Sequence, residues 1–357
     1  MKSPGETQAT FLLSGFCFFV HLQGMEFNKL NHVPSLEEIK QAAKQIQGVV
    51  TETPLEYASR LSERYEANIY LKREDLQGVR SYKIRGAFLK ISNIPVDLRA
   101  QGIVAASAGN HAQGVALACA LLGIQAYIFM PKNTPLQKVE AVRFHGQERV
   151  KIKLVGETFD EAYAASRIFC EKNQAIFIPP FDDFDIIAGQ ATVSLEILSQ
   201  VPQALDYLVL AVGGGGLAAG SALMLEYSSP STQLIAVEPE QAASLTAALA
   251  HGSPVVLPEI DSFVDGAAVK RMGEHTFSIL QNRVDRVIGI DKQQLCQTML
   301  DLYQFYGMIV EPAGALSVAA LAHIAPEIKG KTVVCVISGG NFDPKRFPEI
   351  RERAKNG

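Results

Sequence analysis

The chain has 357 residues, which is long enough for two domains that share an interface. Hydrophobic residues make up 48% of it and charged residues 20%, a balance typical of a globular protein with an ample core. The net charge of −4 provides no basic excess for nucleic acid, so we expect no nucleic-acid partner.

Residues 1–34 are predicted to be an extension ahead of the folded part. The apolar run Phe11–Val20 has ten residues, too few to span a bilayer, so we expect no membrane insertion. It could be the core of a secretory signal, although Lys2 is the only basic side chain before it and no A-x-A site follows. We favour a third interpretation, in which residues 1–24 are non-native or disordered upstream sequence and Met25 is the natural start.

The cysteines show no pairing pattern, since none belongs to a C-x-x-C pair. Two of them fall inside an apolar helix and an apolar strand, where we expect buried thiols. A reducing compartment is the simplest explanation, and we therefore expect a cytoplasmic protein. The five cysteines are Cys17, Cys119, Cys170, Cys296 and Cys335.

The folded part is predicted to begin near Ser35, an expected helix N-cap with two acidic residues in the turn that follows. A turn at Thr53–Leu55 and a short helix over Ala58–Tyr65 come next. The apolar run Ala67–Leu71 then predicts a strand.

Lys83 stands out in the next stretch, because it is placed in the first turn of a predicted helix that runs to Ile94 and has Ser81 as its expected N-cap. The helix dipole there disfavours a cation and would lower the pKa of the amine. Such a lysine is a candidate nucleophile or Schiff-base former. For a lysine taken at random, an ordinary surface position is the more frequent alternative.

Three later units repeat one pattern, in which an apolar strand leads into a glycine-containing turn. Strands that alternate with helices favour a parallel α/β sheet, whose ligands bind at the carboxyl ends of the strands, where these turns lie. The units are Gly102–Ala106 with Ser107–His111 and a helix over Ala112–Leu122; Tyr207–Val212 with Gly213–Gly216 and a helix over Leu217–Glu226; and Thr332–Ile337 with Ser338–Asn341. Further strands are expected at Ala126–Met130, Lys151–Val155, Ala175–Ile178 and Leu234–Val237.

The segment Pro179–Asp183 is the expected crossing between two domains, because a proline pair and two acids interrupt the pattern there. A site built from turns before and after it would lie in the cleft between the domains. We expect a large cofactor-binding domain, a small domain and a tail, with the bounds 35–95 plus 184–345, 96–183 and 346–357.

The four consecutive glycines Gly213–Gly216 offer backbone N–H groups without side chains, at the start of a helix, which suits a phosphate group. The spacing matches neither G-x-G-x-x-G nor a Walker loop. A flexible turn is the alternative for an isolated glycine run, and the position between strand and helix favours the phosphate.

Ser107–His111 offers hydroxyl, amide and backbone donors suited to a small carboxylate. The alternative is that Ser107 and Asn110 only cap the following helix, and Ser338 could likewise face a ligand or only cap a turn. A phosphate site, a carboxylate site, a hydroxyl and an activated lysine together are the set that pyridoxal 5′-phosphate requires.

Six motifs occur in the order found in the threonine dehydratases (threonine ammonia-lyases), which the chain resembles from about residue 35 to residue 343. That family has the tryptophan-synthase-β-like fold, fold type II of the pyridoxal-phosphate enzymes, so the resemblance implies two open parallel-sheet α/β domains with the site in the cleft between them. The motifs are KREDLQGVRSYKIRGA from Lys72, SAGNHAQG from Ser107, VGGGGL from Val212, DGAAVK from Asp265, EPAGA from Glu311 and VISGGN from Val336.

The resemblance also implies a role for each site residue. Lys83 would bind the cofactor aldehyde and move protons, Asn110 would contact the pyridoxal 3′-oxygen, and Ser338 would meet the pyridine nitrogen. The implied cofactor-binding residues are Lys83, Asn110, Gly213, Gly214, Gly215, Gly216, Leu217 and Ser338, and the implied substrate-binding residues are Ser107, Ala108, Gly109 and His111.

The reaction implied by the resemblance converts L-threonine to 2-oxobutanoate and ammonia, with L-serine giving pyruvate as a side activity, in isoleucine biosynthesis or threonine catabolism. Relatives form homodimers or homotetramers. Many also carry a C-terminal regulatory domain that binds isoleucine, but only Phe342–Gly357 follow the last motif, so regulation through such a domain is not expected.

Two alternatives remain open. A serine racemase of the same fold would need a second proton donor, and relatives with that activity have a serine where this chain has Ala108. They also use a divalent metal; Glu238 matches one expected ligand, but Ser244 stands where an acid is expected, and we predict no metal site. A catalytically silent, ligand-binding relative would have lost the lysine or the glycine run, and both are present.

Overall fold

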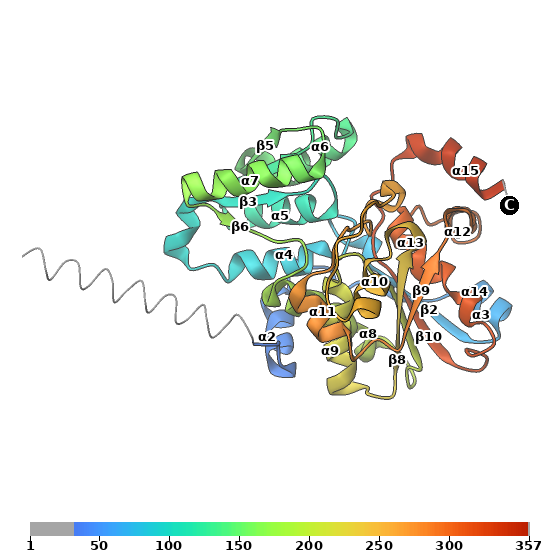
Figure 1. Cartoon of the computed structure of the whole chain (residues 1–357). Helices are drawn as coiled ribbons and strands as arrows, with labels where there is room; N and C mark the ends of the chain where they lie inside the picture. Colours follow the sequence, from blue (N-terminus) through green and yellow to red (C-terminus); the bar gives the residue numbers. More distant parts are fainter. Residues whose placement is uncertain (1–31, 356–357) are drawn as a thin grey trace, which may run out of the picture. The chain divides into compact units, whose positions relative to one another are not determined.

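Two sheets organise residues 32–355, the part of the chain that this computed structural model describes (Figure 1). The described residues from Ser35 onward form one compact unit. The expectations about residues 1–24 and about Cys17 therefore concern residues outside the described part.

The large sheet has six strands in the order β1-β2-β10-β7-β8-β9. All neighbouring pairs are parallel except β1 and β2. The strand β10 was predicted to the residue, whereas β1 and β9 were not predicted. The strands are β1 (Leu55–Tyr57), β2 (Asn68–Arg73), β7 (Tyr207–Ala211), β8 (Gln233–Pro239), β9 (Arg286–Ile290) and β10 (Thr332–Ile337).

The small sheet has four parallel strands in the order β5-β4-β3-β6. All four were predicted from short apolar runs, with bounds that differ by at most one or two residues. The parallel α/β class is therefore confirmed. The strands are β3 (Ile103–Ala106), β4 (Ala126–Met130), β5 (Val150–Leu154) and β6 (Ile176–Phe177).

Helices cover both faces of each sheet. In the small sheet, α7 lies on one face, where it packs near Val104 and Ala106, and α5 lies on the other, near Ile103 and Ala105 (Figure 1). The helices are α2 (Leu36–Ile46), α3 (Ser59–Tyr65), α4 (Lys83–Ser92), α5 (Asn110–Leu122), α6 (Leu136–Gly146), α7 (Phe159–Asn173), α8 (Phe184–Gln200), α9 (Gly216–Ser228), α10 (Ser244–His251), α11 (Glu274–Leu280), α12 (Lys292–Tyr306), α13 (Pro312–Ala319), α14 (Leu321–Ile324) and α15 (Phe347–Lys355).

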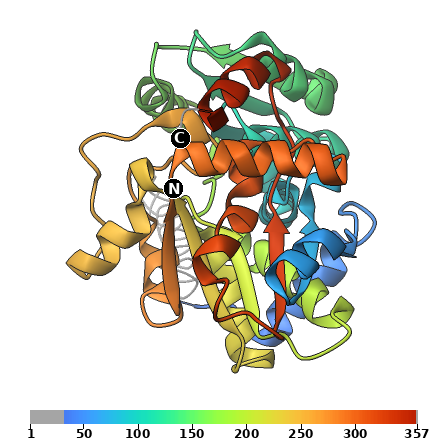
Figure 2. The ribbon, with the colours of Figure 1, turned by 90° about the vertical axis from the view of Figure 1, so that its right-hand side faces the viewer.

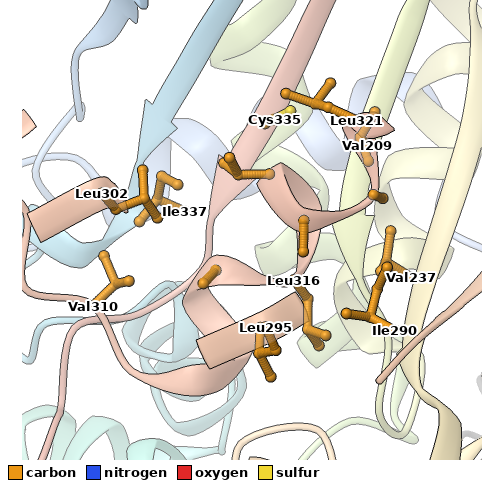
Figure 3. Close-up of a cluster of buried hydrophobic side chains, with 14 of the residues drawn as sticks. Val209, Val237, Ile290, Leu295, Leu302, Val310, Leu316, Leu321, Cys335 and Ile337 are labelled. Carbon is orange, nitrogen blue, oxygen red and sulfur yellow. The ribbon is translucent and has the colours of Figure 1, made fainter. Parts of the chain in front are cut away.

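The central strand β10 shows why the large sheet is covered twice. Side chains alternate between faces along a strand, and here every residue of the strand is apolar or small and buried. Cys335 and Ile337 join the core under α12 and α13 (Figure 3), whereas Val334 and Val336 join the core under α8 and α9. An unbroken apolar run of this kind requires helices on both sides.

The terminal helix α15 packs against α12 at the edge of that first core (Figure 2). Both helices are amphipathic enough to leave an exposed polar face. Within residues 32–355, none of the helices is both long and apolar enough to cross a bilayer.

The first predicted cap is confirmed at α2. Ser35 Oγ accepts the N–H of Glu38, and the Glu38 carboxylate accepts the N–H of Ser35 in return, which is a capping box. Cys119 and Cys335 are buried free thiols, as expected from their apolar surroundings, and burial raises the pKa of both.

Candidate active site

The predicted site residues follow strands of both sheets, and hydrogen bonds of Asn110 to Glu311 and Asn341 join the two parts. The neighbouring strands β2, β10 and β7 lead into the segments that hold Lys83, Ser338 and the glycine run, and β3 of the small sheet leads into Ser107–Asn110. A backbone bridge between Ser81 and Gly339 joins the first two segments. Carboxyl ends of parallel strands thus supply all of these residues, as the fold class predicts.

Lys83 is the first residue of α4, as predicted, and is partly buried. Its Nζ donates a hydrogen bond to the backbone carbonyl of Pro180 at 2.9 Å. Burial lowers the pKa of Lys83 to about 8, while the Glu311 carboxylate opposes the change. The direction agrees with the prediction, and loss of solvent is the largest cause.

The prediction that Ser81 caps this helix was wrong. The residue before α4 is Tyr82, and it makes no side-chain cap. Ser81 is completely buried, and its hydroxyl has no hydrogen-bond partner among the described residues. The pairing of Ser81 with Gly339 places it in an extended segment one residue too early to act as a cap.

Helix α4 is anchored by the buried guanidinium of Arg85. It donates two hydrogen bonds to Glu74, at 2.9 and 2.7 Å, and two to Glu196 on α8, at 2.6 and 2.8 Å. Arg85 and Glu74 are both fully buried. The lysine-bearing helix is therefore fixed in its first turn by a charge pair that no solvent reaches.

Close backbone packing also positions α4. A Cβ on Gly189 of α8 would lie 2.5 Å from the Cα of Gly86, and a Cβ on Gly114 of α5 would lie 3.2 Å from the carbonyl carbon of Lys83. Glycines at both contacts let α5 and α8 approach the turn that holds Lys83.

The glycine run forms the turn between β7 and α9 without intruding side chains. Gly215 has φ +92°, a left-handed conformation that favours glycine. Among the described residues, the six backbone N–H groups from Gly213 to Ala218 have no acceptor. Buried donors without partners are rare and, at the positive end of a helix, favour an anion.

Asn110 connects the small sheet to the large one. Its Nδ2 donates to Glu311 Oε1 at 2.6 Å, and its Oδ1 accepts from Asn341 Nδ2 at 2.7 Å. The capping alternative fails here, because α5 has Gly109 as N-cap and no side-chain cap. Ser107 Oγ instead accepts the N–H of Gly109 at 3.2 Å within the turn.

His111 and Ser338 are buried beside this connection. His111 Nε2 lies 3.0 Å from the carbonyl oxygen of Ile178, which can only accept, so Nε2 carries the proton. Burial lowers the pKa of His111 to about 3, with help from the charge of Lys83, and the ring is neutral. Ser338 Oγ donates to the carbonyl of Ala313 at 3.2 Å.

Sequence reasoning did not single out Glu311 or Asn341. Burial and the charge of Asp265 raise the pKa of Glu311 to about 7, while the hydrogen bond from Asn110 lowers it. Glu311 is 5% exposed and acts electrostatically on Lys83. The sequence pointed to these two residues only because they belong to the EPAGA and VISGGN motifs. Their pairing with Asn110 could not be predicted, since Asn110 lies more than 200 residues away along the chain.

The arrangement fits pyridoxal 5′-phosphate, as the resemblance implied. The N–H groups without acceptors suit its phosphate, and an amine of lowered pKa suits its aldehyde. A hydroxyl and an amide are available for its ring. The residues fit because each type of polar group on the cofactor meets a partner of complementary chemistry.

Glu238, considered above as a metal ligand, caps a helix instead. Its carboxylate accepts the N–H groups of Leu245 and Thr246 at the start of α10. Ser244 Oγ lies 3.5 Å from the carbonyl of Gly213. Within the described residues, no three His, Cys, Asp or Glu side chains gather as they would around a metal ion.

A cavity of about 580 Å³ lies elsewhere, lined mainly by α3 and α12. It contains none of the predicted site residues. The candidate site is therefore defined by its polar groups and their geometry rather than by an open cavity.

Comparison with known proteins agrees with this chemistry. The family model described as "Pyridoxal-phosphate dependent enzyme" matches residues 46–339. The chain is 48% identical over 323 residues to the L-threonine dehydratase biosynthetic IlvA of Lactococcus lactis, covering 90% of this chain and 78% of that protein.

Solved structures show the same similarity. The processed form of threonine deaminase isoform 2 from Solanum lycopersicum has a TM-score of 0.85 and 38% identity, covering 91% of this chain and 90% of that one. Maize serine racemase has a TM-score of 0.83 and 30% identity, covering 90% of this chain and 98% of that one.

Proposed function

The chain belongs to the pyridoxal-phosphate-dependent enzymes, within the threonine dehydratase family, and from this premise we propose how its residues convert L-threonine to 2-oxobutanoate and ammonia. L-Serine, which lacks only the methyl group, would give pyruvate as a side reaction. The name of the bacterial relative favours a biosynthetic role, in the first step towards isoleucine, over a catabolic one.

We assign the cofactor-binding roles by chemistry. Gly213–Leu217 would supply N–H donors to the phosphate, and Lys83 Nζ would be the group that binds the aldehyde. Asn110 would meet the 3′-oxygen with an amide that Asn341 and Glu311 hold in place. Ser338 would meet the pyridine nitrogen, with a hydroxyl oxygen that can still accept a hydrogen bond while its proton is donated to Ala313.

Bound pyridoxal phosphate withdraws electrons from the substrate Cα and so acidifies the Cα proton. Lys83 is the group that takes this proton on Nζ. Its pKa of about 8 leaves a useful fraction of neutral amine near neutral pH, which an ordinary lysine does not have. Loss of the β-hydroxyl then completes the elimination, with the proton it needs supplied by Nζ.

The substrate carboxylate is assigned to the turn Ser107–His111. This turn begins helix α5, whose first N–H groups favour an anion. His111 is neutral and already donates to Ile178, so it fixes the turn and contributes no charge. Ser107 can donate its hydroxyl proton to the carboxylate while it accepts from Gly109.

The observation that supports the proposal best is the partly buried Lys83 amine, which has a lowered pKa and donates a hydrogen bond to the carbonyl of Pro180. The test is a comparison of wild type, Lys83→Ala and Lys83→Arg with pyridoxal phosphate and L-threonine. Wild type should show the visible absorbance of lysine-bound cofactor and release equal amounts of ammonia and 2-oxobutanoate. Both variants should lose the absorbance and the turnover; turnover retained by Lys83→Ala would contradict the assignment.

The second candidate is amino-acid racemisation, favoured by the structural similarity to maize serine racemase. Ala108 has no proton to give, so the second proton donor is missing at that position. Chiral analysis of L-serine reactions separates the two functions. Formation of D-serine at a rate comparable to pyruvate would favour the racemase.

We propose in addition a homodimer or homotetramer in the cytoplasm. The oligomeric state is proposed from the resemblance to oligomeric relatives. The cytoplasmic location is proposed from the four free cysteines among the described residues, because free thiols are typical of a reducing compartment. Light scattering of the purified protein tests the oligomeric state.

A further inference from the structure

The domain crossing Pro179–Asp183 contacts both chemical groups of the site. The carbonyl of Pro180 accepts from Lys83 Nζ. The ring of Phe181 covers the glycine turn, since a Cβ on Gly214 would lie 2.1 Å from a ring carbon. A segment expected only to join two domains therefore lies against the lysine and the anion-binding turn.

Asp182, the next residue of the crossing, caps a helix 92 or more residues further along the chain. Its carboxylate accepts the N–H groups of Glu274 at 3.0 Å, His275 at 2.9 Å and Thr276 at 3.2 Å. The local N-cap of α11 is Gly273, where a Cβ would lie 2.2 Å from Asp182 Oδ1. The helix thus receives its cap from the crossing.

Thr276 carries this contact to the glycine run. Its Oγ1 donates to the carbonyl of Gly214 at 2.8 Å, and a Cβ on Gly215 would lie 3.0 Å from the Thr276 Cβ. In a trans peptide the C=O and the following N–H point in opposite directions. Fixing the Gly214 carbonyl therefore fixes the direction of the Gly215 N–H, one of the donors without an acceptor.

We propose that Asp182 is a positioning residue for the cofactor phosphate, acting through Thr276 on the N–H donors of Gly213–Gly216. The inference rests on the proposed function, because it concerns the same cofactor. Asp182 touches neither phosphate nor substrate in this assignment. It orients the donors in advance, which lowers the cost of binding the anion.

The experiment measures the Kd of pyridoxal phosphate for apo-protein by absorbance titration, and the stability of the apo-protein by urea unfolding. Asp182→Ala and Thr276→Val should each raise the Kd by roughly 10-fold, the scale of supporting hydrogen-bond partners at bound groups. The Kd of the double variant should not exceed the higher Kd of the two single variants, because both substitutions interrupt the same connection from Asp182 through Thr276 to Gly214. Asp182→Asn keeps one acceptor oxygen and should lie between wild type and Asp182→Ala.

Asp291→Ala is the matched control, because Asp291 caps α12 by accepting the N–H of Gln294 at 2.8 Å. It should lose stability without losing cofactor affinity. A Kd within about twofold of wild type for Thr276→Val, or an equal loss of affinity in Asp291→Ala, would overturn the inference. Failure of the wild type to bind the cofactor would instead overturn the proposed function.

Discussion

Lys83 donates its Nζ hydrogen bond to the carbonyl of Pro180, 97 residues away, and not to a carboxylate. A carbonyl oxygen can accept a hydrogen bond from a neutral amine as well as from an ammonium, so this contact favours the protonated form less strongly than an ion pair with a carboxylate would. The carboxylate of Glu311 acts on Lys83 only through its charge. The amine can therefore lose its proton while its position is kept.

Capture of pyridoxal phosphate by the apo-protein should depend on pH with a midpoint near 8. The neutral amine is the reactive form, and burial lowers the pKa of Lys83 from 10.5 to about 8, so the rate rises as pH increases through that value. Glu311→Gln removes a negative charge that raises this pKa, and the midpoint should move to lower pH. Stopped-flow absorbance between pH 6 and 10 measures both; a midpoint near that of free lysine would contradict the burial argument.

Glu311 should also make the apo-protein less stable as pH rises through 4.5 to 7. Its pKa is raised from 4.5 to about 7 mainly by burial, so the folded state binds more protons than the unfolded state in this window. The contribution of protonated Glu311 to the free energy of unfolding is fully present below pH 4.5. As pH rises towards 7, that free energy should fall by roughly 3 kcal/mol. Urea unfolding at several pH values should show a smaller decline in Glu311→Gln, with the exposed Glu327→Gln as control.

Arg85→Met should destabilise the protein by about 3–5 kcal/mol, because it leaves the buried carboxylate of Glu74 without its charged partner. Replacing Glu74 by Gln at the same time should recover part of the loss. The control is Arg143→Met, which interrupts an exposed pair with Glu140 and should cost less than about 1 kcal/mol. Urea unfolding measures the free energy of unfolding of both single variants. An equal decrease in the two would show that the buried ion pair stabilises the fold no more than the exposed pair does.

Gly189→Ala should separate α8 from α4, because the added Cβ would lie 2.5 Å from the Gly86 Cα, and backbone cannot yield as a flexible side chain does. Overpacking of this kind costs about 1–3 kcal/mol. Thermal unfolding should show the loss, and Lys83-dependent turnover should fall with it. Gly78→Ala, where an added Cβ meets nothing within 4 Å, is the matched control and should be nearly neutral.

Local patterns predicted most of the fold. The strand β10 was found to the residue because its apolar run is bounded by polar residues, and the start of α4 was found because Lys83 follows a turn. The cap of α4 was wrong because a partner 258 residues away, Gly339, decides the conformation of Ser81. The strand β9 was missed, since its sequence, RVIGI, contains a charge and a glycine.

The candidate site was predicted in composition but not in its connections. Each glycine turn could be recognised from its own residues, and the structure brings all three to one place. The hydrogen-bond partners of Asn110 and Asp182 could not be predicted, because each partner lies more than 90 residues further along the chain. The raised pKa of Glu311 depends on burial, which only the assembled fold provides. The roles assigned to individual residues stay predictions until the variants are measured.

The position of β10 has a consequence for biosynthesis. This strand comes last in sequence among the described strands, yet it pairs with β2 on one side and β7 on the other. A nascent chain on the ribosome cannot close the middle of the large sheet until residues 332–337 have emerged, so neither Lys83 nor the glycine run can take its final place earlier. The cofactor site should therefore form only after this strand has been synthesised.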